Sequence, residues 1–202
     1  MKALLLIDIQ NDFVPGGALA VPGGDEIIPL VNELQPRFEL VVATQDWHPA
    51  QHGSFASQHP GRQPFEQAEL AGLPQTLWPD HCVQGTPGAA LHPALDQHRI
   101  EAIFRKGTDP AIDSYSGFYD NGHRKSTGLA DYLRGRGVQQ LYLAGLAADY
   151  CVNFSALDAR AEGFEVFFLE DATRAISADG YQQARTELLR RGVQFMPAAE
   201  VR

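Results

Sequence analysis

Cysteine and long hydrophobic runs are both scarce in this sequence, and each scarcity excludes a class of protein. Only Cys82 and Cys151 are cysteines among the 202 residues. The first apolar run stops at Asp8, which makes it too short for a signal-peptide core or a membrane span, and no later run reaches the length of a transmembrane helix. We therefore expect a cytoplasmic protein whose cysteines are free thiols rather than a structural disulfide.

Positive charge is also in short supply. The chain has 16 lysines and arginines against 25 aspartates and glutamates, a formal net charge of −9. Proteins bind nucleic acids and anionic membranes through basic patches, so neither partner is expected. A hydrophobic fraction of 44% is ordinary for a globular protein, and 202 residues suffice for one hydrophobic core but are few for two. We expect a single domain over residues 1–202.

What the sequence does contain is a regular alternation of short apolar runs and helical patterns. Continuous apolar runs are typical of parallel strands buried on both faces of a sheet. The six expected strands are residues 3–8, 40–44, 102–105, 141–146, 166–169 and 193–196. The four expected helices are residues 26–34, with Asp25 as N-cap, and 129–136, 149–162 and 177–191, each of these three ending before a glycine. The alternation predicts an α/β fold in three layers, α/β/α, around a mostly parallel sheet of about six strands.

Two segments carry little strand or helix signal. Residues 47–98 are rich in proline, glycine, glutamine and histidine, and residues 108–125 form a second, shorter loop. A loop as long as the first inside a compact domain is either functional or wrongly assigned.

Polar side chains follow four of the expected strands. Asp8 ends the first strand, Asp46 and His48 follow the second, Lys106 follows the third, and Cys151 comes shortly after the fourth. In open parallel sheets, ligands bind outside the carboxyl ends of the strands. We therefore expect an acid, an acid–imidazole pair, a lysine and a thiol to meet at one edge of the sheet.

Cys151 is the candidate nucleophile of this group. It lies two residues into an expected helix, where free N–H groups and a nearby lysine would stabilise a thiolate, and a carboxylate could take the thiol proton. The small residues of A-G-L-A-A-D (144–149) would let backbone N–H groups of residues 146–151 form an oxyanion hole. Cys82 is a rival nucleophile, but it lies in a loop, where only the adjacent imidazole or a bound ion would lower its pKa.

Asp46 and His48 present an oxygen and a nitrogen ligand that could reach one metal ion. His52, His59 and His81, all in the long loop, could complete the site. Carboxylate together with imidazole suits zinc, iron, manganese or cobalt. For D-x-H alone, a polar histidine-rich loop without an ion is the plainer interpretation. His81 favours the metal site, because it lies in the unusually apolar and aromatic loop segment L-W-P-D-H-C-V-Q-G.

Six motifs carry a resemblance to a known family. They are L-I-D-I-Q-N-D-F-V-P-G-G-A-L (6–19), T-Q-D-W-H-P-A-Q-H-G-S-F (44–55), W-P-D-H-C-V-Q-G-T-P-G-A (78–89), F-R-K-G (104–107), Y-S-G-F (115–118) and G-L-A-A-D-Y-C-V (145–152). In this order, over residues 1–201, the sequence resembles the nicotinamidase/pyrazinamidase family of the isochorismatase-like cysteine hydrolase superfamily. The resemblance implies that superfamily's Rossmann-like fold. Ala148 departs from it, since the family often has threonine there.

The resemblance also implies roles for individual residues. The implied catalytic triad is Asp8, Lys106 and Cys151. The implied oxyanion hole consists of the amides of Ala147 and Cys151, with a non-proline cis peptide bond before Ala147. The implied metal ligands are Asp46, His48 and His81, with His52 as a fourth ligand in only some members. The implied walls of the substrate pocket are Phe13, Trp78 and Tyr115, with Tyr150 beside them.

The implied activity is the hydrolysis of nicotinamide to nicotinate and ammonia in NAD salvage, through a thioester on Cys151, with pyrazinamide as a further substrate. One divalent metal ion, zinc with iron or manganese as alternatives, would orient the substrate ring. The expected partner is this small molecule, bound by a monomer or small homo-oligomer.

Other functions compete with this one. Hydrolysis of another small amide, such as an N-carbamoyl compound, or of isochorismate gives the metal no aza-aromatic ring to hold, and isochorismatases dispense with the cysteine. A metal-binding or thiol redox-sensing module would need neither Asp8 nor Lys106. A flavodoxin-like nucleotide binder would need a glycine-rich phosphate loop directly after the first strand, and the glycines of V-P-G-G come too late for that.

Overall fold

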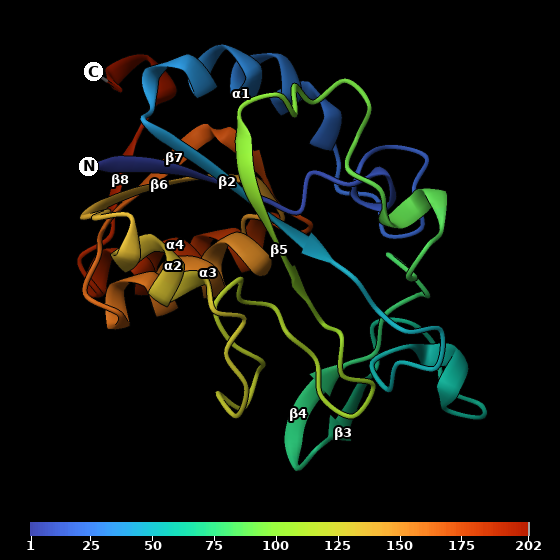
Figure 1. Cartoon of the computed structure of the whole chain (residues 1–202). Coiled ribbons are helices and arrows are strands. Elements are labelled where there is room, and N and C mark those ends of the chain that lie inside the picture. Colours follow the sequence, from blue (N-terminus) through green and yellow to red (C-terminus); the bar gives the residue numbers. More distant parts are fainter. Residues whose placement is uncertain (202) are drawn as a thin grey trace.

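The computed structural model describes residues 1–201, and a six-stranded sheet forms its centre (Figure 1). The strand order is β5-β2-β1-β6-β7-β8, and every neighbouring pair is parallel. The strands are β1 (Lys2–Ile7), β2 (Leu40–Asp46), β5 (Ile100–Lys106), β6 (Gln140–Leu146), β7 (Glu165–Arg174) and β8 (Gln194–Met196). All six predicted strands are confirmed, and β7 extends five residues beyond its predicted end.

Helices cover both faces of this sheet, as predicted. α1 (Ile28–Leu34) lies on one face, and α2 (Leu129–Gly135), α3 (Cys151–Ala161) and α4 (Ala178–Arg190) lie on the other (Figure 1). Successive residues of β1 point to opposite faces. Leu4 therefore packs in one hydrophobic cluster with Val31 of α1, and Leu5 packs in the other with Val152 of α3. Because each face of the sheet packs against a hydrophobic cluster, successive residues of the central strands β1, β2 and β6 are nearly all buried. These strands therefore appear in the sequence as continuous apolar runs.

Two helices begin later than the sequence indicated. Asp25 is not an N-cap, because it lies inside a 3₁₀ turn, Gly24–Ile27, that leads into α1. α3 begins at Cys151 rather than at Asp149, because Tyr150 is non-helical at φ −123° and ψ −99°. The Asp149 carboxylate instead accepts the backbone N–H groups of Ile176 and Ser177, at 3.0 and 2.9 Å. Cys151 is thus the first residue of its helix.

The long loop contains one element that the sequence did not predict. An antiparallel hairpin is formed by β3 (Gln67–Leu70) and β4 (Leu73–Thr76), and Figure 1 draws it away from the central sheet. Its two turn residues, Ala71 and Gly72, both have positive φ. Each strand has only four residues and little hydrophobic alternation, so the pattern gave no strand signal.

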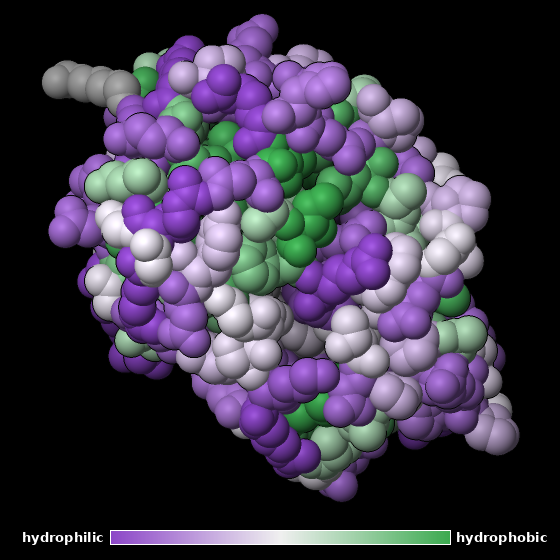
Figure 2. Space-filling view, in the orientation of Figure 1, coloured by the Kyte–Doolittle hydropathy of each residue, from purple (hydrophilic) through white to green (hydrophobic). Residues whose placement is uncertain are grey.

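On the face drawn in Figure 2, hydrophilic side chains predominate, and hydrophobic ones gather where Figure 1 draws the edge strand β5 beneath α1. Ile103 of β5 is one of the exposed large hydrophobic residues, at 46% of its full accessibility. Among the helices within residues 1–201, none has the length and apolar character needed to cross a membrane.

Candidate active site

The four polar groups that follow the strands meet at the carboxyl edge of the sheet, as predicted. Asp46 and Lys106 end β2 and β5 and are paired in register. Asp8 directly follows β1, and Cys151 begins the helix after β6. The side chains come from four different elements, yet all four residues are buried, with at most 7% of their surface exposed.

Lys106 is the centre of this group. Its Nζ lies 2.9 Å from Asp8 Oδ2 and 2.9 Å from Asp46 Oδ1, and it donates to the carbonyl oxygen of Ser114 at 3.0 Å. The Cys151 sulfur lies 3.5 Å from the same nitrogen. Burial opposes the charge on Lys106, but Asp46 and Asp8 outweigh it and raise its pKa well above the usual value. Lys106 is therefore a buried cation between two carboxylates.

The charge state of Cys151 differs from the sequence-based expectation. We expected the helix start and Lys106 to stabilise a thiolate. Burial instead raises the pKa of the Cys151 thiol well above its usual value; Lys106 lowers it, and the Asp8 carboxylate raises it further. The resting thiol is therefore protonated and needs a base.

Asp8 is placed to be that base. Burial raises its pKa, against the lowering effect of Lys106, so its carboxylate accepts a proton more readily than an exposed aspartate. Thr44 Oγ1 donates to Asp8 Oδ1 at 2.6 Å. Asp8 Oδ2 has the ion pair with Lys106 but accepts no hydrogen bond within residues 1–201.

Two backbone N–H groups beside the thiol have no partner among the described residues. They belong to Ala147 and Cys151. The peptide bond between Leu146 and Ala147 is cis, as the resemblance implies. Cys151 is the first residue of α3, and the first N–H groups of a helix have no intrahelical acceptor. Both amides are thus available to an oxyanion.

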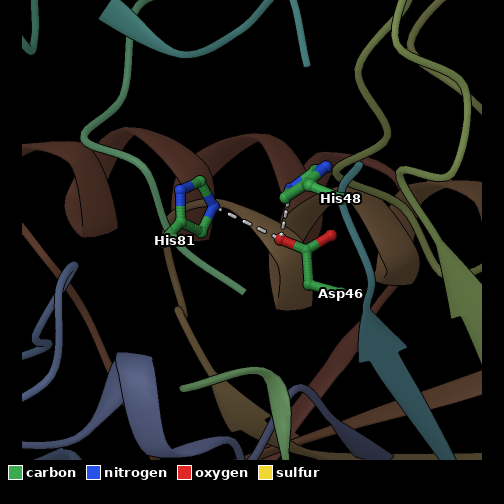
Figure 3. Close-up of side chains that lie close together, drawn as sticks. All are labelled: Asp46, His48 and His81. Carbon is green, nitrogen blue, oxygen red and sulfur yellow. Dashed lines mark hydrogen bonds and ion pairs between the residues drawn. The ribbon is translucent and has the colours of Figure 1, made fainter. Parts of the chain in front are cut away.

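A candidate metal site lies on the other side of Lys106. Asp46 Oδ2 is 2.9 Å from His48 Nε2 and 3.4 Å from His81 Nε2, and Figure 3 shows both rings turned toward this carboxylate. The three ligand atoms lie within 4.8 Å of one another. One oxygen and two imidazole nitrogens form a donor set that suits zinc and related divalent ions.

The hydrogen bonds of the rings fit such an ion. His48 Nδ1 lies 2.9 Å from the carbonyl oxygen of Gly107, and His81 Nδ1 lies 2.8 Å from that of Pro79. A carbonyl can only accept, so each Nδ1 carries a proton and donates it. Burial lowers the pKa of His48, but Asp46 outweighs it and raises that pKa above its usual value, so Nε2 donates to the carboxylate when no ion is bound. A bound cation would replace that proton, and each Nε2 would then present its lone pair to the metal.

His52 belongs to a different group. It lies with His48 and Asp113, whose ligand atoms are within 4.8 Å of its own. The N–H of Ser54 donates to His52 Nδ1 at 3.2 Å, so the proton of the ring is on Nε2. Burial and the neighbouring His48 lower the pKa of His52 to about 4. The structure does not bring His52 to Asp46 and His81, and its use as a fourth ligand stays a prediction. His59 joins neither group.

A cavity between the thiol and the histidines has aromatic walls. All four predicted wall residues line it, together with groups from both halves of the site. The lining residues are Phe13, Leu19, Asp46, Trp78, His81, Asp113, Tyr115, Ala147, Tyr150, Cys151 and Ile176. Trp78 meets Tyr150 edge-on, with ring centroids 4.9 Å apart, and donates through Nε1 to the Tyr115 hydroxyl at 3.3 Å. The shape and chemistry suit a small flat ring with one polar substituent.

Sequence reasoning missed part of this cavity. Asp113 lines it, and Gln75 of the unpredicted hairpin donates to Asp113 Oδ2 at 2.9 Å and to the Tyr115 hydroxyl at 3.0 Å. Ile176 is held in place by the Asp149 carboxylate. In the sequence, only the stretch D-S-Y-S (113–116) around the predicted wall residue Tyr115 pointed to Asp113. No sequence pattern pointed to Gln75.

Cys82 does not share this setting. Its side chain is fully buried in the hydrophobic cluster on the α1 face and lines no part of the cavity. Burial raises the pKa of the Cys82 thiol well above the usual value, with Asp46 adding to the effect. The structure therefore gives the rival nucleophile no support.

Fold and site together are those of a hydrolase with a three-layer α/β/α architecture. The family model of the isochorismatase domain matches residues 2–200 of the sequence, so the chain belongs to the isochorismatase family.

Two curated relatives are similar over most of the chain. A nicotinamidase of Escherichia coli is 54% identical over 180 residues, covering 87% of this chain and 84% of the relative. A nicotinamidase of Acinetobacter baylyi is 50% identical over 200 residues, covering 98% of this chain and 94% of the relative.

Solved structures agree with these relatives. A nicotinamidase/pyrazinamidase from Acinetobacter baumanii superposes with a TM-score of 0.97 at 46% identity, covering all of this chain and 98% of its own. The yeast nicotinamidase bound to the inhibitor nicotinaldehyde has a TM-score of 0.92 at 32% identity, over 98% of this chain and 100% of its own. A zinc complex of a pyrazinamidase from Pyrococcus horikoshii has a TM-score of 0.80 at 41% identity, over 97% and 98%.

Proposed function

We propose that this chain is a nicotinamidase that hydrolyses nicotinamide to nicotinate and ammonia and also accepts pyrazinamide. The observation that carries the proposal is the cavity itself, where a thiol with its base and a three-ligand metal site face each other across aromatic walls. Relatives named as nicotinamidases, at 54% and 50% identity, support the same substrate. The activity would return nicotinamide to pyridine nucleotide synthesis.

Asp46, His48 and His81 would hold a divalent ion, and zinc is the ion we propose because a similar pyrazinamidase structure contains it. Iron and manganese suit the same donors. When bound, the ion supplies a Lewis-acid contact that orients the ring nitrogen of the substrate. The aromatic walls would hold the ring flat and direct its carboxamide toward Cys151.

The chemical steps follow from the residues around the thiol. Asp8 takes the proton of Cys151, and Lys106 stabilises the resulting charges, since its cation lies 2.9 Å from Asp8 Oδ2 and 3.5 Å from the sulfur. The sulfur attacks the carboxamide carbon, and the N–H groups of Ala147 and Cys151 donate hydrogen bonds to the oxyanion. Asp8 gives its proton to the leaving nitrogen, the C–N bond breaks, and ammonia departs from a thioester.

Hydrolysis of the thioester reverses these roles. A water molecule attacks the thioester carbon while Asp8 takes its proton. The same two amides hold the second oxyanion. Collapse breaks the C–S bond, the sulfur recovers its proton from Asp8, and nicotinic acid leaves and loses its remaining proton to solvent as nicotinate. Each proton that Asp8 takes is returned within the cycle, so the site ends in its starting state.

The substrate assignment is tested by comparing nicotinamide with benzamide, which has the same carboxamide but no ring nitrogen. We expect kcat/KM for benzamide to be lower by at least about 100-fold, because a site built to bind a polar atom rejects an analogue that lacks it. Ammonia release measures both rates. Equal rates would show that the ring nitrogen has no partner and would favour a general small-amide hydrolase.

Removal of the metal should stop nicotinamide hydrolysis, because the substrate ring then loses the ion that orients it. After dialysis against a chelator, we expect nicotinamide hydrolysis to be lost and to return when one equivalent of zinc is added. Metal analysis before and after dialysis identifies the native ion. Full activity in protein that contains less than a tenth of an equivalent of any metal would contradict the proposed role of the ion.

The remaining parts of the proposal concern the setting of the enzyme. We propose one domain over residues 1–202 that acts in the cytoplasm, as a monomer or small homo-oligomer, on a small molecule and without a nucleic-acid or membrane partner. Size-exclusion chromatography with light scattering measures the oligomeric state.

A further inference from the structure

We propose that Gln10 and Asp12 are positioning residues for the metal ligands Asp46 and His81. Both lie in residues 8–13, the segment that follows β1, and neither lines the cavity or belongs to the candidate metal site. The inference rests on the metal site of the proposed function and not on the identity of the substrate. Both residues belong to the Q-N-D-F stretch that follows Asp8. Residues 8–13 therefore begin at the proposed catalytic base, Asp8, and continue to the two side chains that contact the metal-ligand segments.

Gln10 takes the place of a missing strand partner. β1 ends at Ile7 and turns away at Asp8, where φ is +50°, whereas β2 continues to Asp46. The fully buried Gln10 side chain fills this gap. The N–H of Asp46 donates to Gln10 Oε1 at 2.8 Å, and Gln10 Nε2 donates to the Asp46 carbonyl at 2.8 Å. The side-chain amide thus makes both hydrogen bonds that a neighbouring peptide group would make.

The same amide fixes Asp46 relative to the rest of the site. Gln10 Nε2 also donates to the carbonyl oxygen of Ala89 at 2.8 Å, which ties β2 to the loop that carries His81. On its other side, Asp46 is paired with Lys106 of β5. A primary amide presents the acceptor oxygen and the two N–H donors that these three hydrogen bonds require. Gln10 therefore holds the backbone of Asp46, from which the carboxylate ligand extends.

Asp12 holds the second ligand segment. Its Oδ2 accepts the N–H of Cys82, the residue after His81, at 2.7 Å. The carbonyl of Cys82 in turn accepts the N–H of His48 at 3.0 Å. Gly88 leaves room for this carboxylate, because a Cβ at that position would lie 2.2 Å from Asp12 Oδ2. One carboxylate therefore anchors the backbone beside two of the three ligands.

These contacts predict that the protein binds its metal ion more weakly when Gln10 or Asp12 is substituted. Partners that orient metal ligands typically contribute roughly 10- to 100-fold to affinity. We expect Gln10→Met, which keeps the volume of the side chain but makes no hydrogen bond, to bind zinc weaker by this factor. Asp12→Asn keeps one acceptor for the Cys82 amide, so its loss should be smaller.

The experiment measures the zinc dissociation constant by competition with a chromophoric chelator, and the visible absorption spectrum of the cobalt-substituted protein. The matched control is Gln35→Met, because Gln35 is a fully buried glutamine that also donates to a backbone carbonyl, that of Asp96 at 2.8 Å, but contacts no ligand segment. We expect wild-type zinc affinity for the control and an altered cobalt spectrum for Gln10→Met. The Tm of each metal-free variant shows whether the fold is intact.

Each outcome decides the proposal. Gln10→Met with wild-type affinity and cobalt spectrum overturns it, as does an equal loss of affinity in Gln35→Met. If Gln10→Met fails to fold, Gln10→Glu carries the test, because it keeps the acceptor for the Asp46 N–H and loses the donor to the Asp46 carbonyl. Wild-type affinity and cobalt spectrum in that variant would overturn the role of Gln10. A wild-type chain that binds no zinc overturns the metal site of the proposed function as well, so the two failures are distinguishable.

Discussion

Cys151→Ala is expected to abolish ammonia release from nicotinamide, with kcat lower by about 10⁵-fold or more, because residues that act as one catalytic unit fail together. The sulfur is the atom that attacks the carboxamide, and among the described residues no other thiol lines the cavity. Zinc content and Tm should stay near wild type, since the thiol holds no metal ligand. The measurement is ammonia release under saturating nicotinamide.

The matched control is the other buried cysteine. Cys82→Ala removes the same atom from a side chain that packs in the core and lines no part of the cavity, so ammonia release should persist. Alkylation supplies a second readout, in which nicotinamide should protect Cys151 and leave Cys82 unaffected. Near-normal hydrolysis by Cys151→Ala, or its loss in folded Cys82→Ala, would assign the nucleophile to another group.

The meeting of these residues could be predicted from the sequence because the geometry of a parallel sheet is simple. Asp8, Asp46 and Lys106 each follow or end a continuous apolar run, and the carboxyl ends of parallel strands lie on one edge. No fold-specific contact had to be known for this step. The metal ligand His81 was harder, since it lies in a long loop, and only its unusual neighbours and the family resemblance indicated it.

What the sequence could not give were the properties set by burial and by short irregular segments. The Cys151 thiol lies at a helix start beside Lys106, yet its pKa is raised, because the loss of solvent outweighs both favourable charges. Gln75 contacts the cavity residues Asp113 and Tyr115 from a hairpin of two four-residue strands. A contact of this kind depends on the tertiary path of the loop, which hydrophobic periodicity does not encode.

Lys106→Met should have the largest effect on stability as well as on catalysis. We expect kcat to fall by about 10⁴-fold or more, because Asp8 then loses the cation that stabilises the charged pair. The substitution also leaves the buried Asp8 carboxylate without its cationic partner, while Asp46 keeps His48. Removing one member of a buried ion pair costs roughly 3–5 kcal/mol of unfolding free energy. Urea unfolding of the metal-free protein measures this loss.

The loss of stability should depend on pH in a defined direction. Burial and the nearby Asp46 raise the pKa of Asp8 even with Lys106 present, and in the variant only the hydrogen bond from Thr44 still opposes them. A carboxyl whose pKa is higher in the folded than in the unfolded state binds more protons when folded. Its folded state is therefore favoured at low pH and loses stability as pH rises above the ordinary aspartate value of about 4. The gap between wild type and Lys106→Met should widen from pH 4 to pH 7.

The matched control for this prediction is Lys125→Met, the same substitution at an exposed lysine, which should leave activity and its pH-dependent stability near wild type. A Lys106→Met protein that is as stable as wild type at pH 7 would mean that the fold does not need the cation between the two carboxylates, and would contradict the predicted cost of the broken ion pair.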